Sequence, residues 1–136
     1  MFDILEHPAD IGFRASGSTL AELFANAAIA MLSIAGDPAA AQPQLEYPIS
    51  AEGSDYESLL VNWLNEVLYW FDGKRVAFGS FRVTHLEPVS IHALALGEPR
   101  DNERHRAKLI VKAVTYHQLK LERSGDGWVC EIYLDI

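Results

Sequence analysis

The stretch most informative about the fold is Val111-Lys112-Ala113-Val114-Thr115-Tyr116-His117-Gln118-Leu119, near the end of the sequence. The stretch begins as an apolar strand, yet it holds a lysine and ends in a polar Thr-Tyr-His run. A strand buried on both faces is a nearly continuous apolar run, and a lysine inside one is costly unless it is paired or reaches a cleft. Acids stand near both chain ends, at Asp10 and Asp135. We therefore predict that this strand brings Lys112 to a site formed by the two ends.

Length and composition limit the class of protein. The chain has 136 residues, of which 49% are hydrophobic, so we expect a single domain over residues 1–136. Eleven basic and 19 acidic residues give a net charge of −8, which argues against non-specific binding to nucleic acid but leaves room for a small basic patch. The N-terminus has no secretory signal pattern, and no apolar run approaches the ~20 residues of a membrane span. We expect a cytoplasmic protein with no membrane partner.

Two segments have the apolar spacing of amphipathic helices. The first begins at a capping box formed by Thr19 and Glu22, carries an apolar stripe from 20 to 34, and ends at Gly36. The second begins at a capping box over 54–57, carries a stripe from 56 to 71, and ends at Gly73. The tryptophans of this second stripe are expected to pack in the core.

The remaining segments have strand patterns, and most of the predicted strands follow the second helix. Strands are predicted over 1–6, 11–15, 45–51, 76–84, 89–96, 108–115, 118–123 and 128–135. Pro48 places its strand at a sheet edge or bulge, and the turn 124–127 predicts a terminal hairpin. The polar segment 97–106 is expected to be a surface loop. These elements predict an α+β fold, two-layer, with a mostly antiparallel sheet or sheets packed with two amphipathic helices; the strand order does not follow from the pattern.

Three carboxylates form a possible site if the chain ends meet. Asp10, Asp135 and the terminal carboxylate of Ile136 offer only oxygen, which Ca²⁺, Mg²⁺ and Mn²⁺ prefer. Two simpler interpretations stay open at this point. Asp10 alone is typical of a turn residue, and a salt bridge from Lys112 to one of these acids accounts for the same residues without a metal.

Other catalytic patterns find little support. Cys130 is the single cysteine, has no evident base nearby in sequence, and is expected to be a small buried hydrophobe. No nucleotide-binding glycine loop and no zinc-type cysteine or histidine pair is present in the sequence. Glu98, Asp101 and His105 are close in sequence, but a solvated loop is the favoured interpretation. His7 and His117 stand out only for their neighbours.

A series of short motifs runs along essentially the whole chain. They are Glu6-His7-Pro8-Ala9-Asp10-Ile11-Gly12, Leu23-Phe24-Ala25-Asn26-Ala27-Ala28, Leu59-Leu60-Val61-Asn62-Trp63-Leu64-Asn65-Glu66, Gly97-Glu98-Pro99-Arg100-Asp101, Arg104-His105, Val111-Lys112-Ala113-Val114-Thr115-Tyr116-His117 and Asp135-Ile136. In order and spacing they are similar to the archease family, whose opening motif is Glu-His-Thr-Ala-Asp-(Ile/Val)-Gly. The one departure is Pro8, where the family usually has threonine.

The resemblance implies a function in RNA processing. Archeases are protein cofactors of the RtcB-type RNA ligase of tRNA splicing and RNA repair. They promote guanylylation of the ligase histidine and multiple turnover, so the resemblance implies a non-catalytic activator that meets RNA indirectly, through the ligase. It also implies a divalent-metal site (calcium, magnesium or manganese) at Asp10, Asp135 and the carboxylate of Ile136. It implies a functional Lys112, which we expect to contact a phosphate or the partner. We take His7, Glu98 and His117 as secondary candidates.

Two other functions remain as hypotheses. A metal-dependent phosphoester hydrolase using the same acids predicts turnover by the isolated protein. A chaperone-like interaction module predicts that Asp10 and Asp135 can be neutralised without loss of function, while exposed apolar residues matter.

Overall fold

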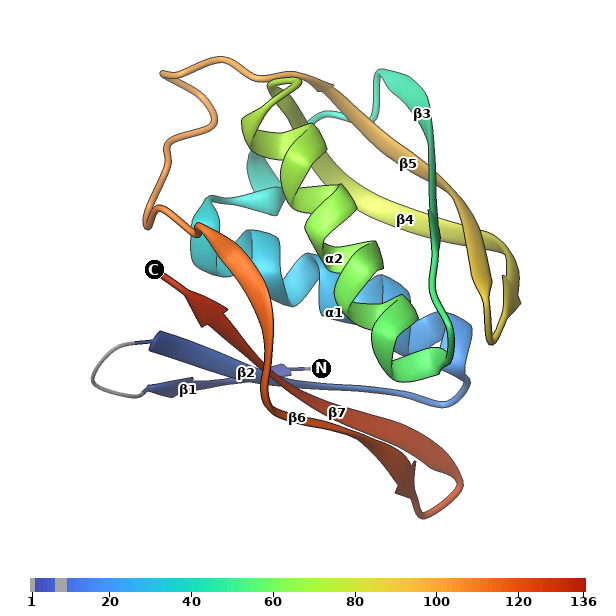
Figure 1. The fold of residues 1–136 in the computed structure, drawn as a ribbon. Coiled ribbons are helices and arrows are strands. Elements are labelled where there is room, and N and C mark those ends of the chain that lie inside the picture. The colour runs from blue at the N-terminus through green and yellow to red at the C-terminus, as the bar shows by residue number, and fades with distance from the viewer. Residues whose placement is uncertain (1, 7–9) are drawn as a thin grey trace.

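The fold was obtained as a computed structural model that describes residues 2–6 and 10–136 (Figure 1). Its elements, in chain order, are β1 (Phe2–Glu6), β2 (Asp10–Gly17), α1 (Leu20–Ala35), the 3₁₀ turn η1 (Pro38–Ala40), β3 (Leu45–Glu52), α2 (Tyr56–Asp72), β4 (Val76–Glu87), β5 (Ser90–Pro99), β6 (Ala113–Ser124) and β7 (Gly127–Asp135). None of the helices in this described part is long and apolar enough to cross a bilayer.

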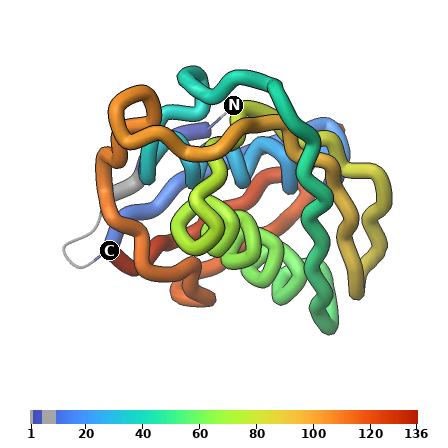
Figure 2. The backbone as a smooth tube through the Cα atoms, turned by 90° about the horizontal axis from the view of Figure 1, so that it is seen from above, coloured from blue at the N-terminus to red at the C-terminus, as the bar shows by residue number. Residues whose placement is uncertain are grey.

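The strands form two antiparallel sheets, and the helices lie between them. One sheet has the order β1-β2-β7-β6 and the other β3-β5-β4. Helix α1 contacts β2 and β4, and α2 contacts β3 and β6, so each helix packs on both sheets (Figures 1 and 2). The predicted α+β class is confirmed. Because β2 pairs with β7, the first and last parts of the chain are neighbours in one sheet.

Helix α1 begins and ends as its sequence predicts, with one difference in the cap. The Thr19 side chain accepts a hydrogen bond from the backbone N–H of Glu22 at 3.1 Å, and Gly36 is the C-cap. The Glu22 carboxylate does not reach back to the N–H of Thr19. It accepts instead from the backbone N–H and the hydroxyl of Ser18, one residue earlier, because that hydroxyl offers a second donor.

Helix α2 begins one residue later than the predicted box. Its N-cap is Asp55, whose carboxylate accepts from the N–H of Ser58, while the Ser58 hydroxyl accepts from the N–H of Asp55. The box therefore uses a serine at its third position, where the sequence analysis expected a glutamate. The predicted end at Gly73 is confirmed, and Trp63 is fully buried, with its indole N–H donating to the carbonyl of Phe24 at 3.0 Å.

The late strands differ most from the prediction. The hairpin of β6 and β7 around 124–127 is confirmed, and Pro48 does lie on an edge strand, β3. However, the expected strands 108–115 and 118–123 are one strand, β6, which begins only at Ala113. Its pairing with β7 jumps between Thr115 and Lys120, so residues 116–119 form a bulge. Gln118 adopts a positive φ of 52° there, a local geometry that apolar alternation does not reveal.

Candidate functional site

Two aspartates from opposite ends of the chain lie side by side. In the antiparallel pairing of β2 with β7, Asp10 stands directly opposite Asp135. The oxygen Oδ1 of Asp10 is buried and has no hydrogen-bond partner among the described residues. Ile136, the last residue of this sequence, follows Asp135 directly and is 37% exposed. The two ends therefore meet, as the sequence analysis predicts.

This arrangement has the chemistry of a cation site. Two carboxylates opposite each other on neighbouring strands repel, and a buried carboxylate oxygen without a donor is costly. A hard divalent ion relieves both costs because it binds oxygen ligands. In the part of the chain that is described, no three His, Cys, Asp or Glu side chains gather in a metal-binding group. A cation site here would therefore draw on the carboxylates of Asp10 and Asp135 and on the main-chain carboxylate of Ile136.

The backbone of Lys112 adjoins these acids. Its surroundings correct the prediction that this lysine lies inside an apolar strand. It lies before β6 rather than inside a strand, and its side chain is exposed. The N–H of Lys112 donates to the carbonyl of Asp135 at 2.7 Å. The residue also borders an open groove with Tyr69 and Asp72 of α2. No ion pair of the described residues joins Lys112 to Asp10 or Asp135, so the salt-bridge explanation is not supported.

Asn65 of α2 positions this region and was missed by the sequence analysis. Its amide oxygen accepts from the N–H of Val114 at 2.9 Å, and its amide nitrogen donates to the carbonyl of the same residue at 3.3 Å. The pair of bonds fixes the start of β6 against the helix, two residues after Lys112. Its only sequence signal is a polar amide between the apolar positions Leu64 and Val67 of the stripe.

Gly12 owes its place in the opening motif to an aromatic ring. Gly12 stands opposite Tyr133, and a Cβ at this glycine would lie 2.6 Å from Cε1 of that ring. Tyr133 is 5% exposed, and the ring of His117 in the β6 bulge packs against it with centroids 6.2 Å apart. Asp10 and Gly12 share one face of β2 because side chains alternate along a strand. The Tyr133 ring therefore lies next to the two aspartates on this face of the sheet.

Glu98 lies in the other sheet and is buried, which corrects the predicted solvated loop. Its side chain is 2% exposed and that of His105 is 3% exposed. Oε1 accepts from Nη2 of Arg104 at 2.6 Å, and Oε2 accepts from the N–H of Gln42 at 2.7 Å. Nε2 of His105 lies 2.9 Å from Oε2, while its Nδ1 accepts from the N–H of Asp101. Because Nδ1 is the acceptor, Nε2 carries the proton and donates to Glu98.

These donors hold Glu98 in its ionised form. The hydrogen bond from Arg104, followed by that from the backbone of Gln42, lowers the pKa of Glu98 from 4.5 to about 2. A carboxylate with donors on both oxygens has little capacity left for a metal ion. Glu98 therefore pins the loop after β5 to the connection before β3, at a distance in the fold from the paired aspartates.

The single cysteine has the environment that the sequence predicts. Cys130 is fully buried in β7, as predicted, and this burial raises the pKa of its thiol to about 12. A thiol of that pKa is not a nucleophile near neutral pH. His7, together with Pro8, lies outside the described residues.

Comparison with known proteins gives the family. The family model described as "Archease protein family (MTH1598/TM1083)" matches residues 2–136. Proteins named "Protein archease" from Methanosarcina acetivorans and Pyrococcus furiosus are 41% and 40% identical to this chain, with 99% and 96% of the chain and 95% of each relative covered.

Solved structures agree. The solution structure of Methanobacterium thermoautotrophicum protein 1598 has a TM-score of 0.86 at 31% identity, with 99% of this chain and 98% of that one covered. The crystal structure of a Thermotoga maritima protein, described as an archease and possible chaperone, has a TM-score of 0.65 at 22% identity, over 100% of this chain and 98% of that one, and shows the shared fold. The chain belongs to the archease family.

Proposed function

We propose that this chain is a non-catalytic activator of an RtcB-type RNA ligase in the cytoplasm. It promotes guanylylation of the ligase histidine and multiple turnover in tRNA splicing and RNA repair. Membership of the archease family supports this proposal. The observation that carries it is the register of β2 and β7, which sets Asp10 against Asp135 and leaves one buried oxygen of Asp10 without a hydrogen-bond partner among the described residues.

The chain's own residues then hold a divalent ion, which we propose to be calcium, magnesium or manganese. Asp10, Asp135 and the carboxylate of Ile136 would be its ligands, since all three offer oxygen at one end of the sheet. Such an ion supplies positive charge, which neutralises the oxygens of a phosphoryl group. Asp135 ends β7, which pairs with β2 on one side and with β6 on the other, and Asp10 is its partner on β2, so the two acids are presented in a fixed geometry.

Lys112 complements this site as a second cation. Its backbone is bonded to Asp135 while its side chain is exposed beside the groove along α2. A fixed backbone with a free ammonium group suits contact with a phosphate or with a carboxylate of the partner, because lysine acts as a mobile point charge. We propose that Lys112 contacts the partner rather than the metal.

The test is ligation by an active RtcB-type ligase under multiple-turnover conditions, with and without this protein. Asp10→Asn and Asp135→Asn are expected to abolish the stimulation, because each removes a charged ligand. Asp126→Asn, at the far turn of β6 and β7, is the matched control and should stimulate like the wild type. A two-glycine extension after Ile136 moves the carboxylate away and should impair stimulation while the protein stays folded.

The same experiment separates the other two hypotheses. If the isolated protein hydrolysed phosphoesters in a metal-dependent way, the activator proposal would give way to a hydrolase. If both aspartate variants stimulated fully, the metal site would have no role and the chaperone-like module would be favoured. The Thermotoga maritima relative is described as a possible chaperone. The control variant is therefore included so that a chaperone-like role can be recognised.

A further inference from the structure

Charge is distributed very unevenly in this acidic chain. The C-terminal end of α2 with its following turn (72–75) and the segment 98–112 hold seven of the 11 basic residues but only four of the 19 acidic ones. This corner therefore carries +3, and the rest of the chain −11. The two stretches are joined in space, because Arg100 donates its N–H to the carbonyl of Arg75 and its guanidinium to the carbonyl of Phe71.

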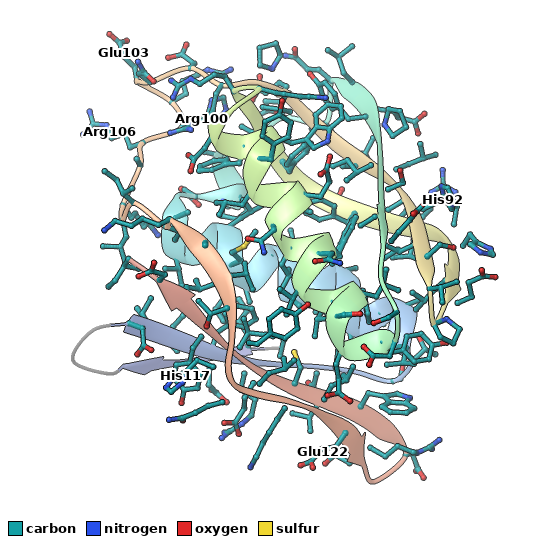
Figure 3. The ribbon with its side chains drawn as sticks, in the orientation of Figure 1. His92, Arg100, Glu103, Arg106, His117 and Glu122 are labelled. Carbon is teal, nitrogen blue, oxygen red and sulfur yellow. The ribbon has the colours of Figure 1, made fainter. Side chains whose placement is uncertain are left out.

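Part of this corner is a row of outward-facing side chains along segment 106–112. Leu109 and Val111 face the core, while Arg106, Lys108 and Lys112 are exposed. Figure 3 shows Arg106 on the outer side of the loop, pointing away from the helices. The backbone of the row is anchored, since the N–H of Lys108 donates to the carbonyl of Ala35 at 3.0 Å. Two residues of chain span at most about 7 Å, so Arg106 and Lys108 stay close, while Lys112 lies four residues beyond Lys108.

The cations of this row also lack a partner within the described chain. Elsewhere in that part of the protein, some arginines form ion pairs, such as Arg14 with Glu131 at 2.9 Å and Arg82 with Glu46 at 3.9 Å. No ion pair or side-chain hydrogen bond of the described residues involves the side chains of Arg106, Lys108 or Lys112. Unpaired cations gathered on one fixed segment of an acidic protein form a concentrated positive surface, which attracts anions.

We infer that the row Arg106–Lys108–Lys112 is a binding surface for the phosphate backbone of single-stranded RNA. The row extends along an open surface, where Arg106 and Lys112 border two separate open grooves, so it fits a chain of phosphates better than one small anion. Ile110 projects between the lysines and is 76% exposed, which gives an apolar contact for a base or sugar. We choose RNA over another polyanion because of the proposed function. The row of cations itself is observed independently of that function.

The inference adds a direct contact to the function proposed above. The proposed contact with the ligase uses one cation of the row, Lys112, so the exposed Arg106 and Lys108 remain for RNA. A row beginning beside the paired aspartates, at Lys112, and running away from them to Arg106 would lead a strand toward the acidic site. The net charge of −8 makes this binding weak, and the contacts of the three cations with phosphates make it dependent on salt.

The experiment uses a fluorescein-labelled 12-nucleotide oligouridylate and measures its anisotropy with the full chain at several salt concentrations. Arg106→Gln/Lys108→Gln is the test variant, which leaves Lys112 in place. Arg82→Gln/Lys120→Gln is the matched control, because it removes one arginine and one lysine that are exposed elsewhere. The test variant should raise Kd about tenfold at 50 mM salt and lower the salt slope by about 1.4, at ~0.7 per cation for a single strand.

The outcomes are decisive in either direction. The control variant should keep Kd within about twofold of the wild type, since its cations lie outside the row. No binding by the wild type at low salt, or an equal loss in both variants, would overturn the inference. Retained oligonucleotide binding together with weakened ligase binding would also overturn it, and would assign the row to a protein partner. Stimulation of the ligase is measured separately, so failure of the proposed function is distinguishable from failure of the RNA contact.

Discussion

Glu98 is buried and Asp10 is partly buried, but the two carboxylates differ in their hydrogen-bond partners. The Glu98 carboxylate accepts from Arg104 on one oxygen and from Gln42 and His105 on the other. Oδ1 of Asp10 is buried without a donor among the described residues and faces a second acid, Asp135, across the strand pair. The first carboxylate is satisfied within the described chain, whereas the second is not.

The difference separates a structural acid from a candidate ligand. Buried polar groups in native proteins nearly always have partners, and an exception asks for a reason such as an ion. Glu98 joins three segments of the chain, so its donors hold the loop that leads to Lys112. No side-chain hydrogen bond of the described residues involves Asp10 or Asp135; their backbones pair β2 with β7, and the carbonyl of Asp135 accepts from the N–H of Lys112. Stability should therefore depend on Glu98, and metal binding on Asp10.

The largest expected effect is on stability, from Glu98→Ala. The substitution leaves the buried His105 and the N–H of Gln42 without their acceptor, so we expect the melting temperature to fall by about 5–10 °C. Asp10→Asn is the comparison variant, because it removes a repelled charge and should leave the metal-free melting temperature unchanged or higher. Thermal unfolding followed by circular dichroism measures both. A larger loss for Asp10→Asn than for Glu98→Ala would reverse the assignment.

A smaller effect is expected at Gly12. In Gly12→Ala, the added methyl group would meet the Tyr133 ring at 2.6 Å, so the ring must move from its place beside the aspartates. We expect metal affinity to fall about tenfold, as for other residues that support ligands, with an unchanged strand signal in circular dichroism. Ser16→Ala on the same strand is the control. If Gly12→Ala bound metal like the wild type, the ring would have no part in shaping the site.

The smallest effect concerns acid stability. The pKa of Glu98 is about 2 in the folded protein against 4.5 for an ordinary glutamate, so its contribution is complete above pH 4.5 and is lost as the pH falls toward 2. Glu98→Gln should flatten the loss of stability in this window, as measured by denaturant unfolding at several pH values. The control is Glu122→Gln, an exposed glutamate of β6 (Figure 3). An equally steep loss in Glu98→Gln and wild type would contradict the assigned pKa.

Local patterns explain which parts of the fold the sequence could predict. The helices and the last hairpin depend on spacing within one segment, such as the apolar stripe of α2 and its stop at Gly73. The meeting of Asp10 and Asp135 was a correct prediction, but their register could not be obtained, because strand order depends on long-range pairing. The predicted strands left a gap at residues 116 and 117, but the sequence did not show that this gap belongs to a bulge within one strand, because both halves of β6 are defined by their pairing with β7.

The burial of Glu98 shows the limit most clearly. In sequence it stands in a polar run, which is typical of a solvated loop. Two of its donors, Arg104 and His105, are close in sequence, but the third is the backbone of Gln42, 56 residues away. A charged residue is buried only when its partners are brought together. The partners of Glu98 come together only in the folded chain, so the sequence does not reveal them.

The most direct test of the central claim is a calorimetric titration of Mn²⁺ into the metal-free protein. Wild type, Asp10→Asn, Asp135→Asn and Glu98→Gln are compared at one pH and salt concentration. We predict one site in the wild type and in Glu98→Gln, with similar Kd, and a loss of affinity of about 100-fold or more in both aspartate variants. No binding by the wild type, or equal binding by all four proteins, would contradict a metal site at the paired aspartates.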